Sequence, residues 1–429
     1  MTLSWLSIFR LGLVQMCLGA IVVLTTSTLN RLMVVELALP AVLPGLLVAL
    51  HYGIQITRPN WGFLSDAGGN RTLFIVGGMG VLALGGLGAA WGVALMETAF
   101  APGLAVSIAA YALIGVGVGA SGTSLLALLA TATAPRRRAA AATITWLMMI
   151  FGIAATAGTV GAFLDPYSHA LLLRIVAIVA GSAVLLTILA VWGVERGVEA
   201  QPAHDEQGFV EGLKEVWGER HARNFTIFVF LSMTAYFMQE LILEPYAGLV
   251  FGLTPGQSTS LSGAQNGGVF VGMLLVGIAA TGLRIGSLRS WVIAGCLGSA
   301  ASLAAITVAG SAGISAGLMP GVVALGMFNG MFAVAAIGSM MALAGEGRES
   351  REGTRMGLWG AAQAIAAGFG GLTGAAAADV MRTVVASDAT AFGTVFLAEA
   401  ALFLVAAAMA AKVIQTARAP GRAAMMPGE

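Results

Sequence analysis

Apolar residues in this 429-residue chain gather in long runs, which short polar segments separate. A helix needs about 20 mainly apolar residues to cross the hydrocarbon core of a bilayer. Twelve runs reach that length, so the pattern predicts an all-α membrane protein with twelve transmembrane helices. The first six runs lie near 11–30, 38–57, 73–94, 102–131, 141–163 and 170–192. The second six lie near 225–244, 258–281, 290–310, 317–343, 356–378 and 391–413.

One long polar stretch, Gly193 to Arg223, divides these runs into two sets of six. Two such sets joined by a linker are typical of membrane proteins built from two pseudo-symmetric halves. We therefore expect an N-terminal six-helix half, a cytoplasmic linker, a C-terminal six-helix half and a cytoplasmic tail. Their predicted bounds are 1–192, 193–224, 225–415 and 416–429.

The predicted linker has apolar residues at helical spacing, with charged residues between them. The apolar residues are Phe209, Val210, Leu213, Val216 and Trp217. The pattern indicates an amphipathic helix, and two placements are equally compatible with it. The helix lies on the inner membrane surface, or it packs against the helical bundle as an ordinary linker helix.

The composition agrees with a chain that is mostly surrounded by lipid. Hydrophobic residues make up 58% and charged residues 10% of the chain, whereas a soluble domain carries about 25% charged residues. The net charge of +1 gives no general attraction to nucleic acid. The two cysteines, Cys17 and Cys296, lie far apart inside apolar runs, a pattern that indicates neither a structural disulfide nor a metal site.

Basic residues are distributed unevenly between the two sides of the predicted spans. All but three of the 21 Lys and Arg residues lie on the side that also holds both termini, and the exceptions are Arg31, Arg174 and Arg382. Cytoplasmic loops of membrane proteins carry the excess of basic residues. The pattern therefore predicts that both termini are cytoplasmic.

The loop after the second predicted span resembles the loop pattern of the major facilitator superfamily, in which an Asp joins the two halves as a gating latch. The predicted latch residues are Gly62, Asp66, Gly69, Arg71 and the preceding Arg58. This copy has Ala67 where the superfamily usually has a basic residue after the Asp. The resemblance implies the two-halved major facilitator fold and says nothing about the substrate.

His51 is an ionisable residue inside the second predicted span, with Gln55 and Arg58 four and seven residues further on. This spacing gives the helix one polar face. Ionisable groups at membrane depth are costly, so they are candidates for function. Two roles are open for His51. Its neutral imidazole ligates the magnesium of a chlorin, or it forms a buried hydrogen bond to a neighbouring helix, which the spacing alone favours.

Four carboxylates lie at or near membrane depth: Glu36, Glu240, Glu244 and Glu399. Tyr236, Glu240 and Glu244 follow one another at intervals of four, which predicts a shared helix face, and Pro245 is expected to end the regular helix. Such groups serve as proton relays in transporters, or they pair with basic residues and hold helix ends together. For Glu36 and Glu244 we favour the structural role, and for Glu240 and Glu399 both roles stay open.

With these residues laid out, the chain resembles the PucC/LhaA family, the bacteriochlorophyll-delivery branch of the major facilitator superfamily. The segments that carry the resemblance are Leu29 to Leu37, Ala49 to Tyr52, Arg58 to Asp66 and, most distinctively, Met238 to Gly252. The resemblance places six residues on positions of the family pattern: Glu36, His51, Gln239, Glu240, Glu244 and Pro245. Family members often carry Asp where this chain has Glu240, which keeps the charge.

The resemblance implies that the chain assists the assembly of light-harvesting complexes by delivering or shielding bacteriochlorophyll or a late precursor. It also implies antenna polypeptides as partners, pigment as a ligand rather than a tightly bound cofactor, and a place in the intracytoplasmic photosynthetic membrane. Members serve the peripheral antenna or the core antenna, or are encoded among pigment-synthesis genes. The compact length of this chain slightly favours the third kind.

Two other classes of function compete with pigment handling. A proton-coupled transporter of a small apolar or amphipathic solute needs an aqueous central cavity lined by charges, but the helices of the predicted cavity are very poor in charge. Their polar residues are Gln15, Thr25 to Thr28, Gln265, Asn266, Asn329 and Gln363. Such a lining suits a large apolar ligand better than a sugar or an ion. The sequence shows neither a metal cluster, nor a nucleophile beside a base, nor an Asp-rich prenyl-diphosphate motif, so we expect no enzymatic activity.

Overall fold

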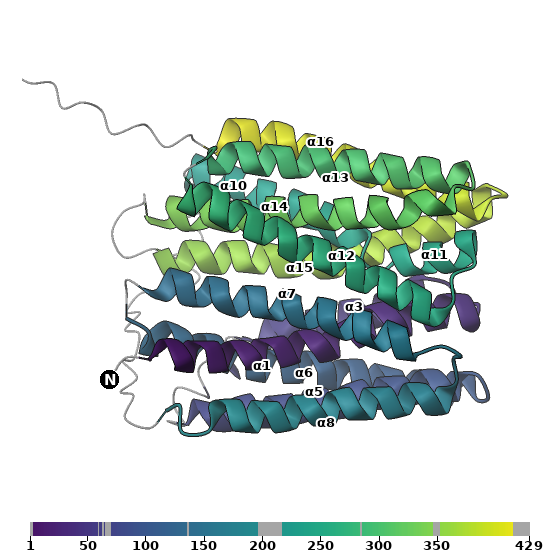
Figure 1. Cartoon of the computed structure of the whole chain (residues 1–429), viewed down its shortest axis with the longest axis horizontal. Coiled ribbons are helices and arrows are strands. Elements are labelled where there is room, and N and C mark those ends of the chain that lie inside the picture. Colours follow the sequence, from purple (N-terminus) through teal and green to yellow (C-terminus); the bar gives the residue numbers. More distant parts are fainter. Residues whose placement is uncertain are drawn as a thin grey trace, which may run out of the picture.

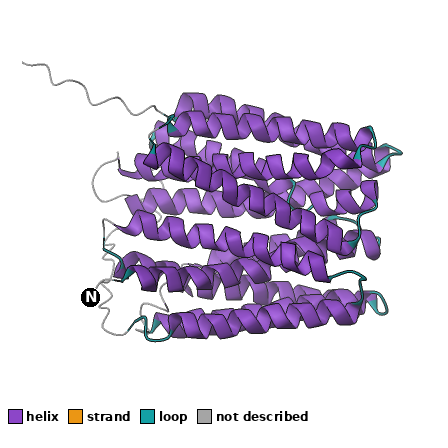
Figure 2. Ribbon diagram, in the orientation of Figure 1, coloured by secondary structure: helices purple, strands orange, loops and turns teal. Residues whose placement is uncertain are grey.

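The computed structural model describes residues 3–58, 60–61, 64, 70–134, 137–195, 217–283, 285–345 and 352–414. In these ranges the chain forms helices joined by loops and no strand, as Figure 2 shows. The predicted all-α fold is therefore confirmed. The predicted linker helix falls almost wholly outside the described residues.

The first set of helices is interrupted near its start. Span one, Trp5–Glu36, contains α1 (Trp5–Val23), a π-helical segment (Leu24–Thr28), α2 (Leu29–Arg31) and a second π-helical segment (Leu32–Glu36). The spans that follow are regular. They are α3 (Val42–Ile54), α5 (Arg71–Met96), α6 (Phe100–Ala132), α7 (Arg138–Phe163) and α8 (His169–Val191).

The second set of helices also begins with a broken span. Arg220–Phe251 contains α10 (Arg220–Met238) and α11 (Leu243–Phe251), which a four-residue turn separates. The remaining helices are α12 (Pro255–Val276), α13 (Leu288–Ser311), α14 (Leu318–Gly345), α15 (Glu352–Val384) and α16 (Asp388–Val413).

Eleven helices in the described part of the chain are long and apolar enough to cross a membrane. The shorter apolar helix Val42–Thr57 occupies the place of the second predicted span. Each of the twelve predicted spans therefore corresponds to a helix. The bounds differ most at span one and at span seven, where the helices extend several residues beyond the predicted ends.

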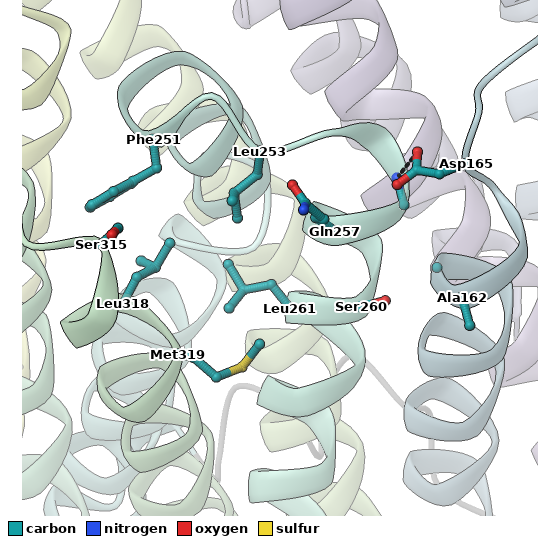
Figure 3. A pocket seen from close by; sticks show the side chains of 12 residues that line it. Ala162, Asp165, Phe251, Leu253, Gln257, Ser260, Leu261, Ser315, Leu318 and Met319 are labelled. Carbon is teal, nitrogen blue, oxygen red and sulfur yellow. Dashed lines mark hydrogen bonds between the residues drawn. The ribbon is translucent and has the colours of Figure 1, made fainter.

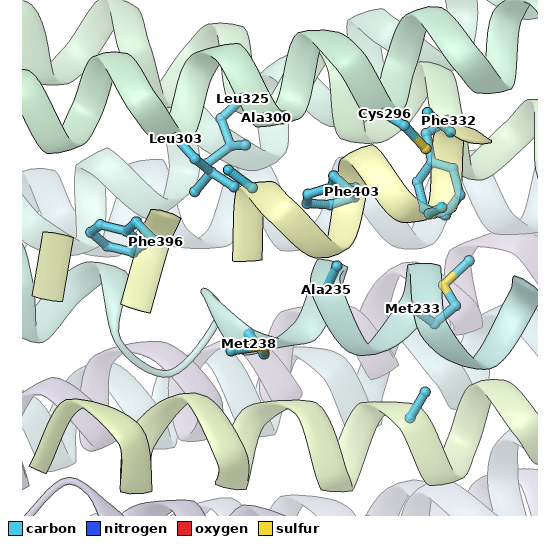
Figure 4. Packing of buried hydrophobic residues seen from close by; sticks show 14 of the residues in the cluster. Met233, Ala235, Met238, Cys296, Ala300, Leu303, Leu325, Phe332, Phe396 and Phe403 are labelled. Atoms are coloured by element: carbon cyan, nitrogen blue, oxygen red, sulfur yellow. The ribbon is translucent and has the colours of Figure 1, made fainter. Parts of the chain in front are cut away.

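Two large hydrophobic cores divide the bundle, and a third, small cluster of Ile150, Val269 and Met273 joins α7 to α12. One is built from residues up to Val194 together with Leu241, and the other mainly from residues after Ala222. Figure 4 shows part of the second core, where Phe396 and Phe403 of α16 pack with Leu303 of α13 and Phe332 of α14. Cys17 and Cys296 are free and buried, one in each core. This division is the two-halved arrangement expected from the twelve spans.

The two halves contact each other mainly through two helix pairs, α3 with α15 and α7 with α12. Figure 1 shows that α1 begins and α16 ends at the same end of the bundle. We call the opposite end, which holds Glu36, Leu253 and Asp379, the distal end.

Candidate functional site

The three polar residues predicted on one face of the second span form a hydrogen-bonded series. His51 lies in α3 with 2% of its surface exposed, and its Nε2 atom lies 3.0 Å from Gln55 Nε2. Arg58 donates a hydrogen bond to Gln55 Oε1. Helical spacing brings the three side chains together because residues four apart share a face.

The direction of this series determines which imidazole nitrogen carries the proton. Gln55 Oε1 accepts from Arg58, so the amide nitrogen of Gln55 is the donor toward His51. His51 Nε2 must then be the acceptor, and the hydrogen of the neutral ring lies on Nδ1. Nδ1 has no hydrogen-bond partner among the described residues. It is therefore the ring atom that remains available to a ligand.

An aromatic contact joins this polar group to the second half. The His51 and Tyr52 rings are 4.7 Å apart between centroids, and Tyr52 lies 6.1 Å from Phe237 of α10. Phe237 in turn packs on Tyr236 at 5.0 Å. Glu240 lies in the turn that follows α10, three residues after Phe237. We call these residues, with Gln55 and Arg58, the central patch.

Glu240 belongs to this patch, but Glu244 does not. The helical turn is interrupted at residues 239–242, so the face predicted to run from Tyr236 to Glu244 is broken. Pro245 does not end the helix, as the sequence suggested, but lies in the first turn of α11. Proline is tolerated in a first turn because the N–H groups there have no partner within the helix.

Glu244 lies instead in a second polar group, where the broken spans one and seven meet. Ser27 donates a hydrogen bond to Glu244 Oε1, and Asn30 Nδ2 donates to the Leu241 carbonyl oxygen at 2.7 Å. Arg31 pairs with Glu36 at 2.5 Å and donates to the Leu253 carbonyl at 2.7 Å. We call this group the distal junction, because every contact except the Arg31–Glu36 pair joins the two halves.

Two aspartates that the sequence did not single out also join the halves at the distal end. Asp379 of α15 accepts from the backbone N–H groups of Ala41 and Val42 at 2.9 and 2.7 Å, so it caps the start of α3. Asp165 accepts from Thr254 Oγ1 at 2.5 Å and from the Gly256 N–H at 3.1 Å. Asp379 was missed because the predicted span 356–378 ended one residue before it.

We expect Asp379→Ala to destabilise the contact between α3 and α15. Loss of a capping side chain costs about 0.5–2 kcal/mol. The apparent melting temperature of the purified protein should fall. Asp388→Ala is the control, since Asp388 forms a partly exposed ion pair with Arg382, and such pairs contribute little. An equal fall in both variants would contradict the capping role of Asp379.

Glu399 lies apart from both polar groups. It is fully buried in α16, on the helix face that also carries Phe396 and Phe403. Neither carboxylate oxygen has a hydrogen-bond partner in the part of the chain that the structure describes. Its role stays open between proton relay and structural group.

Most of the predicted latch lies outside the described residues, including Gly62, Asp66 and Gly69. Arg71 begins α5, and its backbone N–H donates to Glu195 at 3.1 Å, while Arg71 Nη1 donates to Thr131 Oγ1 at 2.7 Å. Glu195, which was not among the predicted site residues, therefore caps the start of α5.

A pocket of about 500 Å³ lies at the distal end between α7, α11, α12 and α14 (Figure 3). Its lining is mainly apolar, with Phe251, Leu253, Leu261, Leu318 and Met319, and the polar side chains of Asp165 and Gln257 at one side. Among the described residues, no group of three or more His, Cys, Asp and Glu residues gathers to hold a metal ion.

The fold is shared with solved transporters. A bacterial homologue of the human lysosomal transporter Spinster, in an inward-facing and unoccupied conformation, superposes with a TM-score of 0.71 over 95% of this chain and 97% of that chain, at 15% identity. The nucleoside transporter NupG superposes with a TM-score of 0.67 over 96% and 98%, at 13% identity. At such identities the likeness shows the fold, which is the major facilitator fold.

Sequence comparison identifies the family. The protein named bacteriochlorophyll synthase 44.5 kDa chain of Rhodobacter capsulatus is 68% identical over the whole of both chains. The protein PucC of Rhodobacter capsulatus is 29% identical over 95% of this chain and 92% of that protein. The sequence model described as PUCC protein matches residues 28–418. The chain therefore belongs to the PUCC protein family.

Proposed function

We propose that this chain binds bacteriochlorophyll or a late precursor in the membrane and assists its incorporation into light-harvesting antenna polypeptides. The names of its relatives refer to bacteriochlorophyll and to PucC. The single structural observation that carries the proposal is His51, whose Nδ1 atom is buried near the contact between the halves without a partner among the described residues.

The central patch suits a large, mostly apolar molecule with a few polar groups. Tyr52, Tyr236 and Phe237 supply aromatic surface, and His51 supplies one polar contact. Sites for such ligands combine an apolar lining with a small number of placed polar groups. In this structure the aromatic contact between Tyr52 and Phe237 closes the patch. Pigment binding therefore requires α3 and α10 to separate at this level.

His51 Nδ1 contacts the pigment in this proposal. In the tautomer that Gln55 imposes, Nδ1–H donates a hydrogen bond to a carbonyl oxygen on the edge of the chlorin. Direct ligation of magnesium would need the other tautomer, with the lone pair on Nδ1 and the hydrogen on Nε2. Gln55 would then have to turn and present its oxygen to His51, which would break its hydrogen bond from Arg58.

The chain acts on the pigment by holding it rather than by transforming it. The relative that is 68% identical has the word synthase in its name. The central patch combines an imidazole, an amide and a guanidinium in a series that orients one ring nitrogen. This arrangement serves binding, and it matches a fold shared with transporters.

A proton-coupled transporter of a small apolar or amphipathic solute is the second candidate. The observation that favours it is Glu240, a half-buried carboxyl group without a hydrogen bond or ion pair to another described residue. Intramembrane carboxylates of this kind serve as proton relays in transporters.

The placement in the membrane is part of the proposal. The 21 basic residues support an inner-membrane protein with both termini cytoplasmic, so the distal end faces away from the cytoplasm. The halves span 1–192 and 225–415, joined by the linker 193–224. In a phototrophic host this membrane is the intracytoplasmic photosynthetic membrane, which also holds the antenna polypeptides.

The absorption spectrum of the protein, purified in mild detergent from a photosynthetic host, tests the proposal. We expect bacteriochlorophyll or a precursor at about one molecule per chain. A control membrane protein of similar size, purified identically, should carry far less. A colourless preparation would contradict pigment binding and favour the transporter.

A further inference from the structure

The first helix of each half is broken. In span one, π-helical segments flank α2, and in span seven residues 239–242 leave the helix between α10 and α11. π-helical insertions occur frequently at functional sites. In two-halved membrane proteins, interrupted helices at corresponding positions of the halves indicate a site for a substrate or a coupling ion. The distal junction is therefore a candidate site distinct from the central patch.

Oxygen atoms dominate the distal junction. Ser27 of span one donates to Glu244 and lies 2.9 Å from Ser262 of α12. The hydroxyl oxygen of the next residue, Thr28, lies 3.3 Å from the hydroxyl oxygen of Thr259, also of α12. Three helical segments, from both halves, thus converge on one carboxylate. Hard cations prefer carboxylate, hydroxyl and carbonyl oxygens of this kind.

Two buried oxygen acceptors in the junction lack a donor. Glu244 Oε2 and Asn30 Oδ1 have no hydrogen-bond partner among the described residues, and their side chains are 2% and 0% exposed. The amide nitrogen of Asn30 is fixed by its bond to the Leu241 carbonyl, so the orientation of Oδ1 is fixed as well. A buried carboxylate oxygen without a partner is costly, and a cation beside it removes that cost.

With both carboxylates ionised, the junction carries two negative charges, on Glu36 and Glu244, against the one positive charge of Arg31. Arg31 forms an ion pair with Glu36, and Glu244 remains as the third charged group that faces the junction. The Ser27 hydroxyl and the positive N-terminal end of α11, where Glu244 lies in the first turn, both stabilise a carboxylate there. One monovalent cation neutralises the group, whereas a divalent ion would leave an excess of positive charge beside Arg31.

We propose that the distal junction binds one Na⁺ ion. Its ligands are the carboxylate of Glu244, the Oδ1 atom of Asn30 and the hydroxyl oxygens of Ser27 and Ser262. Because these ligands come from span one, α11 and α12, the bound ion holds the two halves together at the distal end. A ligand that binds one conformation better than another shifts the protein toward it. Na⁺ therefore stabilises the conformation with the distal end closed.

Binding of radioactive sodium to the purified full-length protein tests this site directly. We expect saturable binding of one ion per chain, which unlabelled Na⁺ displaces and choline does not. Glu244→Gln should abolish binding, and Ser27→Ala should weaken it at least about tenfold. Glu399→Gln is the matched control, because it makes the same change at another buried carboxylate whose oxygens have no partner among the described residues, and it should bind like the wild type.

A thermal melting series accompanies the binding assay and shows that each variant is folded. Na⁺ should raise the apparent melting temperature of the wild type and of Glu399→Gln, and not that of Glu244→Gln. The absence of saturable Na⁺ binding by the wild type would overturn the site. Unchanged binding by both Glu244→Gln and Ser27→Ala would also overturn it. If the junction released a proton on titration but bound no Na⁺, the junction would be a proton site and the Na⁺ site would be overturned.

Discussion

His51→Ala should lose most of the bacteriochlorophyll that co-purifies with the wild-type protein. His51 Nδ1 is the buried polar atom of the central patch that has no partner among the described residues, and the substitution removes it. Loss of a buried hydrogen-bond partner costs about 1–3 kcal/mol, so affinity should fall about fivefold to 150-fold. The ratio of pigment absorbance to protein, measured after purification, gives the result.

Gln55→Glu distinguishes the two ways in which His51 could contact the pigment. A carboxylate cannot donate to His51 Nε2, so the ring must place its hydrogen on Nε2 and a lone pair on Nδ1. If Nδ1–H donates to a pigment carbonyl, this variant should lose pigment as His51→Ala does. If Gln55→Glu instead retains more pigment than the wild type, Nδ1 is a magnesium ligand. A carboxylate that accepts from one nitrogen of an imidazole makes the other nitrogen more basic.

His169→Ala is the control for both substitutions. His169 lies at the distal end, where it contacts Glu97 and Tyr167 rather than the central patch. Its loss should leave the pigment content unchanged. If His51→Ala retained pigment as fully as His169→Ala does, His51 would not be the pigment contact.

Gly272→Ala should strongly destabilise the second half. Gly272 lies in α12, and a Cβ atom there would come within 2.0 Å of the Met327 carbonyl oxygen of α14. A backbone atom cannot turn aside as a side chain does, so the two helices must separate. Overpacking of this kind costs about 1–3 kcal/mol, occasionally more. Small residues at such crossings allow helices to approach closely in a membrane.

Gly267→Ala supplies a matched control in the same helix. No atom lies within 4 Å of a Cβ at Gly267, and alanine is the better helix former by about 1 kcal/mol. The apparent melting temperature should therefore fall for Gly272→Ala and stay or rise for Gly267→Ala. Equal melting temperatures would show that the α12–α14 contact is looser than the structure indicates.

The sequence was sufficient to predict the architecture, because lipid imposes a simple constraint. A spanning helix must be apolar over its length, and this requirement marks each span without knowledge of its neighbours. The polar face of His51, Gln55 and Arg58 was predictable for a similar reason, since it depends only on spacing within one helix.

The breaks in spans one and seven could not be predicted in the same way. Residues 239–242 leave the helix, while Asn30 donates to the Leu241 carbonyl from the other half. A hydropathy profile shows neither the interruption of the helix nor the residue of the other half that bonds to it. Pro245 was visible in the sequence, but a proline fits a first turn as well as it ends a helix. The prediction that Pro245 ends the regular helix was therefore wrong.

The helix caps that come from distant parts of the chain were equally hidden. Asp379 caps α3, which begins more than 300 residues earlier in the chain. Glu195 caps α5 from beyond the end of α8. Both are acidic residues at span ends, where a single sequence gives no sign of the helix that will lie opposite. Only the packing of the spans brings each carboxylate next to the backbone N–H groups at the start of another helix.

Transfer of pigment to antenna polypeptides in lipid vesicles tests the central claim most directly. Pigment-loaded protein is mixed with antenna polypeptides, and the absorption band of the assembled antenna is followed with time. We expect this band to form faster with the loaded wild-type protein than with the same amount of free pigment, and His51→Ala to give no acceleration. Equal rates with and without the protein would contradict a role in delivering pigment to the antenna.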